Sequence, residues 1–365
     1  MAVTLRTPSD QAARRRVLTD IPGTPGMFWG DHSTYVGSFK PPGWLVKLLG
    51  KGWAFNLTGA LSALRLLVRR RNYPGVVTDG GASGLLFAAM QFLLPWGRKP
   101  HVMIDCLWYE SHSRLAMAMK RVFRQIAARS GTRFVVWASH EVDDFARAFG
   151  IPRESLVYVP HYYSLDGYEY TISDDGYLFA GGNGDRDYRT LIEAVAPLGI
   201  PTWIATTNQE ALWDLEIPPH VRVEGTTHSG FRQAMAGARM VVIAMRGGLL
   251  HSGGQQTCLN AMMMGKPTIA VGRKWAVDFI DDQVDGLIVD FGDVEALRTS
   301  IRRVMSQRDL ALEMGRRARI KAEGFHSSSA MEQIYKLAAW PPEKSRDRTS
   351  ALPAQRRLTN RIDNG

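Results

Sequence analysis

The sequence predicts an α/β protein with two doubly wound, Rossmann-like domains that face each other across a cleft. The chain has 365 residues, more than one ordinary domain core accommodates. Short apolar segments alternate with longer helical patterns, which is typical of parallel sheets with crossover helices. This alternation stops in the polar, aromatic segment 161–175 and then restarts. We therefore place the interdomain linker there.

The first domain is predicted to span residues 1–165. Its first 20 or so residues are expected to be disordered or peripheral, and segment 21–42 is rich in turns without a clear strand. A helix is expected at 57–71. The alternating part predicts strands at 75–78, 101–106, 134–138 and 155–159, separated by helices at 83–94, 114–129 and 141–149.

The second domain is predicted to span residues 166–328. Strands are expected at 177–180, 201–205, 221–224, 240–244, 268–271 and 286–289, with helices between and after them. A further helix at 329–340 could cross back to the first domain. The polar tail 341–365 is expected to be disordered.

Composition limits the classes of protein and partner. Cys106 and Cys258 lie far apart, and the N-terminus lacks the apolar core of a signal peptide, so a cytoplasmic location is expected. The net charge of +10 is concentrated in stretches without acidic residues, notably 40–71 and 114–133. These indicate an anionic partner, either a phosphorylated substrate or the inner face of a cell membrane. Solvated helix faces are the alternative, and no nucleic-acid motif is found.

The stretch from His251 to Val271 is the clearest candidate for a ligand-binding turn. A glycine-rich turn precedes a short helical pattern, and Ser252 is a good residue for capping that helix. The backbone N–H groups of such a turn, at the positive end of a helix dipole, suit a phosphate. Ser252, Gln256 and Asn260 are spaced to share one helix face.

The second half resembles the donor domain of GT-B glycosyltransferases, especially the retaining GT4 family (glycosyltransferase group 1). The motifs that carry this resemblance are LFAGGNGDRDYRTLIEAV (178–195), VRVEG (221–225), SGGQQTCLNAMMMGKPTIAV (252–271) and DDQVDGLIVDFGDVEALRTSIRRVM (281–305). The first half matches only in outline. The resemblance implies transfer of a hexose from a UDP- or GDP-sugar to a glycan or lipid-linked acceptor, with retention, in cell-surface polysaccharide or glycoconjugate synthesis.

The resemblance also implies the donor site. It places a first turn, 181–184, under the diphosphate and Arg186 against the phosphates. The loop 226–228, with His228, would lie near the base, and Arg246 and a second turn, 252–254, would lie near the sugar. The residues of the two turns are Gly181, Gly182, Asn183 and Gly184, and Ser252, Gly253 and Gly254. An arginine can offset the charge that builds on a leaving diphosphate. The alternative is a surface arginine paired with Asp185 or Asp187.

The sequence departs from the family at its pair of glutamates, which are replaced by Ser252 and Asn260. An asparagine amide can still bond a ribose hydroxyl. Serine is too short to repeat a glutamate contact, so Gln255 and Gln256 are the candidates to compensate.

On the acceptor side, Asp105 and His112 are the candidate catalytic residues, as a general base or to position a hydroxyl. Further candidates are Asp79, Gly80, Gly81, Trp108, Tyr109, Glu110 and His161. For each, a structural role at a strand end is the alternative, and His140 is interpreted as a local neighbour of a helix cap. The scattered histidines predict no metal site, and no cofactor is expected.

Two other functions remain open from the sequence. One is a nucleotide-sugar epimerase on the same fold. The other is a degenerate GT-B protein that acts as a binding or scaffold partner, because the glutamate pair is absent.

Overall fold

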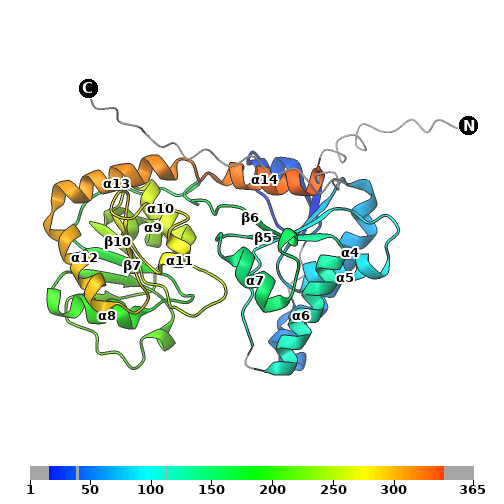
Figure 1. The fold of residues 1–365 in the computed structure, drawn as a ribbon, viewed down its shortest axis with the longest axis horizontal. Helices are drawn as coiled ribbons and strands as arrows, with labels where there is room; N and C mark the ends of the chain where they lie inside the picture. Colours follow the sequence, from blue (N-terminus) through cyan, green and yellow to red (C-terminus); the bar gives the residue numbers. More distant parts are fainter. Residues whose placement is uncertain (1–15, 38–40, 112, 341–365) are drawn as a thin grey trace, which may run out of the picture.

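The computed structural model describes residues 16–37, 41–111 and 113–340. They form two lobes, each built on a six-stranded sheet in which all neighbouring strands are parallel (Figure 1). Helices cover the faces of both sheets. The predicted fold class of two doubly wound α/β domains is confirmed.

The first sheet has the order β2-β1-β3-β4-β5-β6. Its strands are β1 (Val17–Thr19), β2 (Ser33–Tyr35), β3 (Val76–Asp79), β4 (His101–Ile104), β5 (Thr132–Val136) and β6 (Leu156–Tyr158). Its helices are α2 (Phe28–His32), α3 (Gly43–Leu49), α4 (Lys51–Arg69), α5 (Ala82–Leu93), α6 (Arg114–Arg129) and α7 (Glu141–Phe149). Helix α5 contacts both α4 and α6, so these three form one layer.

Two strands of this sheet lie where none was expected. β1 is fully buried between β2 and β3, so the prediction that residues up to about 20 are disordered was wrong for Val17–Thr19. The prediction of a strandless segment at 21–42 was wrong at β2. Strands of three residues are too short to show an alternating pattern, and here the pairing of β1 with both β2 and β3 defines them. The rest of the expected disorder, residues 1–15 and 341–365, lies outside the described residues.

The second sheet has the order β12-β11-β10-β7-β8-β9. Its strands are β7 (Leu178–Gly181), β8 (Thr202–Ala205), β9 (Val221–Val223), β10 (Met240–Ile243), β11 (Thr268–Val271) and β12 (Leu287–Val289). The main helices are α8 (Tyr188–Val195), α9 (His228–Gly237), α10 (Gln255–Met263), α11 (Arg273–Ala276), α12 (Val294–Ser306) and α13 (Arg308–Ala322).

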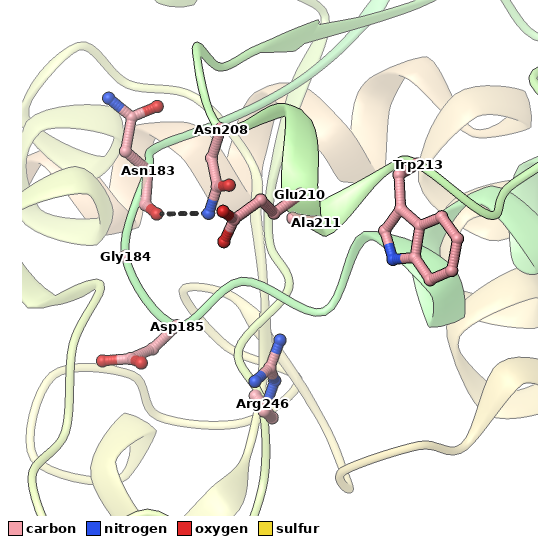
Figure 2. Close-up of a pocket in the computed structure, with 8 residues that line it drawn as sticks. All are labelled: Asn183, Gly184, Asp185, Asn208, Glu210, Ala211, Trp213 and Arg246. Carbon is pink, nitrogen blue, oxygen red and sulfur yellow. Dashed lines mark hydrogen bonds between the residues drawn. The ribbon is translucent and has the colours of Figure 1, made fainter.

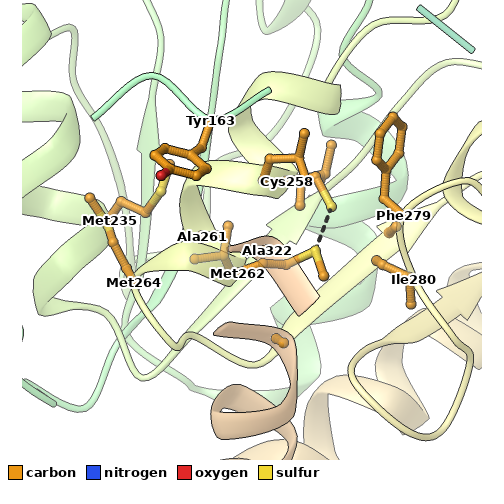
Figure 3. Packing of buried hydrophobic residues seen from close by; sticks show 14 of the residues in the cluster. Tyr163, Met235, Cys258, Ala261, Met262, Met264, Phe279, Ile280 and Ala322 are labelled. Atoms are coloured by element: carbon orange, nitrogen blue, oxygen red, sulfur yellow. Dashed lines mark hydrogen bonds between the residues drawn. The ribbon is translucent and has the colours of Figure 1, made fainter. Parts of the chain in front are cut away.

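Two segments tie the lobes together. Tyr163 of the linker packs into the core beneath the second sheet, among Met235, Cys258 and Met262 (Figure 3). Helix α14 (Ser327–Ala339) returns to the first lobe and packs against α2, β1, β3 and β4 (Figure 1). The linker and α14 therefore both anchor the hinge between the lobes.

The winding of each sheet points to where a ligand can bind. The chain reverses its direction of winding between β1 and β3 in the first sheet, and between β7 and β10 in the second. Ligands of doubly wound proteins bind beyond the carboxyl ends of strands at such switch points. Asp20 and Asp79 lie at the first switch point, and the turn after Gly181 lies at the second.

Candidate functional site

Arg186 lies between the two glycine turns predicted from the sequence. Its Nε donates to the carbonyl oxygen of Gly181 at 2.9 Å, and its Nη1 donates to that of Gly184 at 3.0 Å. A side chain at Gly182 would begin 2.6 Å from Nη2, and one at Gly253 would begin 3.9 Å from Nη1. Glycine at 182 is therefore required for the turn to close over the guanidinium.

The Arg186 guanidinium is buried, and the described residues provide no carboxylate within ion-pair distance of it. Asp185 instead accepts a hydrogen bond from the Tyr109 hydroxyl at 3.1 Å, and Asp187 caps α8 through the N–H of Thr190. A surface arginine paired with either aspartate is therefore wrong for Arg186. Burial lowers the pKa of Arg186, which means that the protein alone does not fully compensate its charge.

A pocket of about 390 Å³ adjoins this cation at the carboxyl ends of β7, β8 and β9 and at the start of α9 and α10. Of the predicted residues, it is lined by Gly182, Asn183, Thr226, Thr227, His228, Gln256 and Asn260. Sequence reasoning missed Thr206, Thr207, Phe231, Arg232 and Thr257, which also line it. Asn183 is held by Thr206, whose hydroxyl donates to its Oδ1 at 2.9 Å.

Helix α10 begins differently from the prediction. Its N-cap is Gly254, with φ +86°, and Ser252 makes no capping bond. A side chain at Gly254 would begin 2.7 Å from Ile243, so the tight turn requires glycine there. Gln255 is buried and donates back to the carbonyl oxygen of Ser252 at 3.0 Å, whereas the exposed Gln256 faces the pocket. Only Gln256 is placed to compensate for a missing glutamate.

Ser252 is bonded to the other domain. Its Oγ lies 2.6 Å from Nε2 of His140, and its N–H donates to Oε1 of Glu141 at 2.7 Å. The other carboxylate oxygen of Glu141 accepts from the N–H groups of Trp137 and Ala138. His140 is therefore a contact between the domains rather than only a neighbour of a helix cap, and the buried Glu141 was missed by the sequence reasoning.

Further contacts close the same side of the cleft. The N–H and hydroxyl of Ser139 both donate to the Asp278 carboxylate, each at 2.6 Å. Lys274 pairs with Asp144. We call this group, Ser139, His140, Glu141 and Asp144 against Ser252, Lys274 and Asp278, the clasp.

The hinge side of the cleft is bonded to the pocket wall. Asn260 accepts the N–H of Ser164 at 2.7 Å, and Arg232 donates to the carbonyl oxygen of the same serine. Since Asn260 and Arg232 both line the pocket, a ligand there contacts groups that hold the hinge.

Asp105 lies where β4 ends, at the cleft. Its backbone is left-handed, with φ +51°, and the indole N–H of Trp137 donates to its Oδ1 at 2.8 Å. The carboxyl remains accessible, although protein surrounds it on most sides, as at the bottom of an open cleft. This partial burial raises the pKa of Asp105 despite the bond from Trp137.

Asp20 is a second carboxyl at this end of the sheet, and the sequence reasoning missed it. Its Oδ2 accepts the hydroxyl of Ser83 at 2.5 Å, and its Oδ1 accepts the N–H of Asp79 at 3.2 Å. Burial, together with the neighbouring Asp79 charge, raises the pKa of Asp20 to about 6. The signal was an aspartate directly after the segment Val17–Thr19, recognisable only once that segment is known to be the strand β1.

Comparison with known proteins supports the same architecture. Residues 182–307 match the family model described as "Glycosyl transferases group 1". Solved structures are similar over most of the chain, including a glycosyltransferase from Rickettsia africae ESF-5 (16% identity, TM-score 0.60, covering 85% of this chain and 86% of that one). The chain has the GT-B fold.

Two other GT-B structures are informative. Anabaena Alr3699/HepE, in complex with UDP and glucose, has 13% identity and a TM-score of 0.62, with 88% of this chain and 98% of that chain covered. TarM of S. aureus has 14% identity and a TM-score of 0.57, but the match spans 77% of this chain and only 58% of that one. No curated protein sequence matches the chain. The predicted resemblance to group 1 glycosyltransferases is confirmed.

Several residues predicted for the donor site lie away from the pocket of about 390 Å³. Arg246 is exposed and lines a separate hollow of about 780 Å³, on the other flank of the turn 183–185, with Asn208, Glu210 and Trp213 (Figure 2). In Figure 2, the Asn208 amide donates to the carbonyl oxygen of Asn183. Arg246 would therefore contact a ligand of the other pocket only if that ligand extended around this turn.

The acceptor-side candidates have divided roles. Trp108 is buried among Phe134, Phe145 and Phe149, so the prediction that it contacts an acceptor was wrong; its bulk fills the core. Gly80 packs against the backbone of Asp105, and the N–H of Gly81 donates to Asp79. Tyr109 and Glu110 are exposed, and Tyr109 bridges to Asp185. His112 lies outside the described residues.

His161 lies beside Trp137, and burial lowers its pKa, so its ring is neutral near pH 7. Its Nδ1 lies 2.8 Å from the backbone N and 3.0 Å from the carbonyl oxygen of Tyr162. A neutral imidazole ring donates from one nitrogen and accepts at the other, so His161 can take part in hydrogen bonds in both ways. Among the described residues, no group of His, Cys, Asp and Glu is arranged to hold a metal ion.

Proposed function

We propose that this protein is a glycosyltransferase that moves a hexose from a UDP- or GDP-sugar to a glycan or lipid-linked acceptor. The observation that carries the proposal is the buried, uncompensated charge of Arg186 beneath two glycine turns, beside a pocket at the switch point of the second sheet. An anionic diphosphate at these turns would supply the missing charge. UDP-glucose is the first donor to test, because HepE has been crystallised in complex with it.

The proposed site uses the pocket residues in separate roles. Asn260 and Gln256 would contact the ribose and base, since both line the pocket with amide groups. Arg186 and the N-terminal N–H groups of α10 would stabilise the diphosphate as it leaves. The clasp would hold the two domains closed over the donor and exclude water from the reaction.

In the proposed reaction, the bond from the sugar C1 to the phosphate oxygen breaks, and its electron pair leaves with the diphosphate. A new bond forms from C1 to the acceptor hydroxyl oxygen, and Asp105 takes the hydroxyl proton. Its raised pKa suits a general base. Retention at C1, a part in cell-surface polysaccharide synthesis, and transfer without a metal ion or cofactor are further proposals that rest on the resemblance.

Calorimetry with UDP, GDP and their hexose derivatives tests this proposal. Binding of a nucleotide sugar with a dissociation constant in the micromolar range, followed by nucleotide release that requires an added acceptor, is expected. Turnover of the sugar nucleotide without acceptor would indicate the epimerase. Absence of binding by every nucleotide would indicate the scaffold protein, which is favoured by one observation: Ser252 and Asn260 are already bonded to the first domain and the hinge.

We also propose that the protein docks on an anionic membrane at the inner face of the cell. Supporting this, helices α3, α4 and α6, which lie within residues 40–71 and 114–133, have exposed faces that combine large apolar and basic side chains. No helix in the described part of the chain is long and apolar enough to cross a bilayer.

A further inference from the structure

A second pocket, of about 330 Å³, lies on the hinge side of the cleft and was not foreseen from the sequence. Its walls come from the N-terminal segment 21–29, the end of β4, the linker 162–168, Arg232 of α9, and the start of α14. These segments are far apart in the chain, and the return of α14 to the first lobe, where it contacts α2, adds its start to the walls (Figure 1). The pocket is therefore a product of the two-domain arrangement.

This hinge pocket shares a wall with the donor pocket. Arg232 lines both. Ser164 lines the hinge pocket and donates its N–H to Asn260, which lines the donor pocket. A ligand in one pocket and a ligand in the other would thus be separated by a partition of a few side chains.

At its other end the hinge pocket reaches Asp105. The indole N–H of Trp137 donates to Asp105, and the backbone N–H of the same tryptophan donates to Glu141. Glu141 in turn accepts the N–H of Ser252, so two residues link Asp105 to the turn that contains Ser252. A hydroxyl group bound in the hinge pocket against Asp105 would face the position proposed for the donor sugar.

The lining of the hinge pocket has the chemistry of a site for a neutral saccharide. Aromatic side chains contribute to its walls: Phe28, Trp29, Tyr162, Tyr163 and Tyr168. Two carboxylates, Asp105 and Asp166, offer acceptors for hydroxyl groups. A concave site with mostly apolar walls and a few convergent polar groups is the usual form of a small-molecule site.

The same lining disfavours an anionic ligand. Arg232 is its only cation among the described residues, and each of its nitrogens donates to a backbone oxygen, of Ser164 or of His228. Its guanidinium is further covered by the ring of Tyr168, 3.6 Å away. No other basic group there would offset a phosphate against two carboxylates.

We propose that the hinge pocket binds the acceptor as a neutral sugar residue and presents one of its hydroxyl groups to Asp105. The identification of the ligand as the acceptor rests on the proposed function. The binding of a saccharide rests only on the lining of the pocket.

Saturation-transfer NMR with methyl glycosides of neutral hexoses, in the presence of UDP, tests the inference. The wild-type protein is expected to give signals from at least one glycoside. Met27→Trp and Ser327→Phe fill the pocket from opposite walls and should each weaken binding at least tenfold. Met119→Trp, an equally bulky change at an exposed position on α6, should leave binding unchanged.

The outcomes separate this inference from the proposed function. If UDP binds but no glycoside does, or if the filled variants keep UDP affinity and glycoside binding alike, the hinge pocket is not the acceptor site. Stronger binding of glycerol 3-phosphate than of any glycoside would also overturn the inference. Glycoside binding without UDP binding would support the pocket while overturning the nucleotide-sugar transferase.

Discussion

At the scale of single residues, the proposed donor site depends most on Arg186. Replacing it with alanine removes a buried charge that is poised for a diphosphate, so UDP affinity should fall about 10- to 100-fold, as expected for a charge-assisted hydrogen bond. Arg186→Lys keeps the charge but lacks the planar guanidinium, so its UDP affinity should lie between those of the wild-type protein and the alanine variant. Titration calorimetry measures both.

The matched control for this prediction is Arg189→Ala. Arg189 lies three residues further along and is exposed, where it pairs with Asp214. Its loss should leave UDP affinity unchanged. Equal effects of the two alanine variants would contradict the assignment of Arg186 to the phosphates.

Asp105 gives a prediction about pH. As a base it must be ionised. Because its pKa is raised, activity should be lost at a higher pH than it would be with an ordinary aspartate. kcat/KM for transfer should therefore fall as the pH decreases through this raised value. Asp105→Asn should lower kcat about 10²- to 10⁴-fold while the UDP affinity stays the same, and an unchanged kcat would exclude Asp105 as the base.

Asp20 should make the stability of the protein depend on pH. Its pKa is about 6 in the folded state and near 3.8 when unfolded, so its folded form favours the proton. The contribution of Asp20 to the free energy of unfolding is fully present at low pH and is lost as the pH rises through 6. The loss is about 3 kcal/mol at most. Asp20→Asn should flatten the decrease in unfolding free energy between about pH 4 and 6, measured by denaturant titration. If the unfolding free energy of this variant depended on pH in the same way as that of the wild-type protein, Asp20 would not be the cause of the decrease.

At the scale of elements, the clasp joins the first turn of α7 to the turn before α10. Glu141 accepts three backbone N–H groups with its two oxygens, two within its own domain and one from Ser252. Glu141→Gln replaces one acceptor by a donor and leaves buried N–H groups unpaired. We expect a loss of about 2 kcal/mol in unfolding free energy and weaker UDP binding.

Glu154→Gln is the control for this change, because Glu154 is exposed and far from the cleft in the fold. If both variants unfold alike and bind UDP alike, Glu141 does not couple the domains.

The elements also show how far sequence reasoning extends. The glycine turns, α10 and the strands of the second sheet could be predicted because glycine, proline and apolar periodicity are local signals. β1 could not be predicted, because a strand of three residues is too short to show a periodic pattern of apolar residues. Asp20, which follows β1, was missed for the same reason. Contacts such as His140 with Ser252 join residues 112 positions apart, and no local pattern records which helix will face which turn.

At the scale of the whole molecule, catalysis without a metal ion is a further prediction. At the proposed donor site, the charge of the diphosphate would be offset by the N-terminus of α10 and by Arg186. Transfer from UDP-glucose should therefore be unchanged after treatment with EDTA. A loss of activity that added Mg²⁺ or Mn²⁺ restores would show that a metal takes part.

The exposed face of the first domain allows the proposed membrane contact to be tested. Large apolar side chains that remain exposed on α3 to α6 include Trp44, Leu48, Leu61, Leu64, Val68, Leu115, Met119 and Val122. Basic residues such as Lys47, Arg69 and Arg121 lie on the same helices, and each basic side chain near an anionic surface contributes about 1 kcal/mol.

The protein should therefore float with vesicles that contain phosphatidylglycerol at low salt, and less with neutral phosphatidylcholine vesicles or at high salt, where the charges are screened. Leu48→Ser should weaken flotation by removing an apolar contact at this face, whereas Leu312→Ser, at an exposed leucine of α13 in the second domain, should not. Because the hinge pocket and the donor pocket open into the cleft rather than onto α3 to α6, Leu48→Ser should also leave UDP affinity unchanged. Flotation that is insensitive to lipid charge, or equally reduced by both substitutions, would contradict docking through this face.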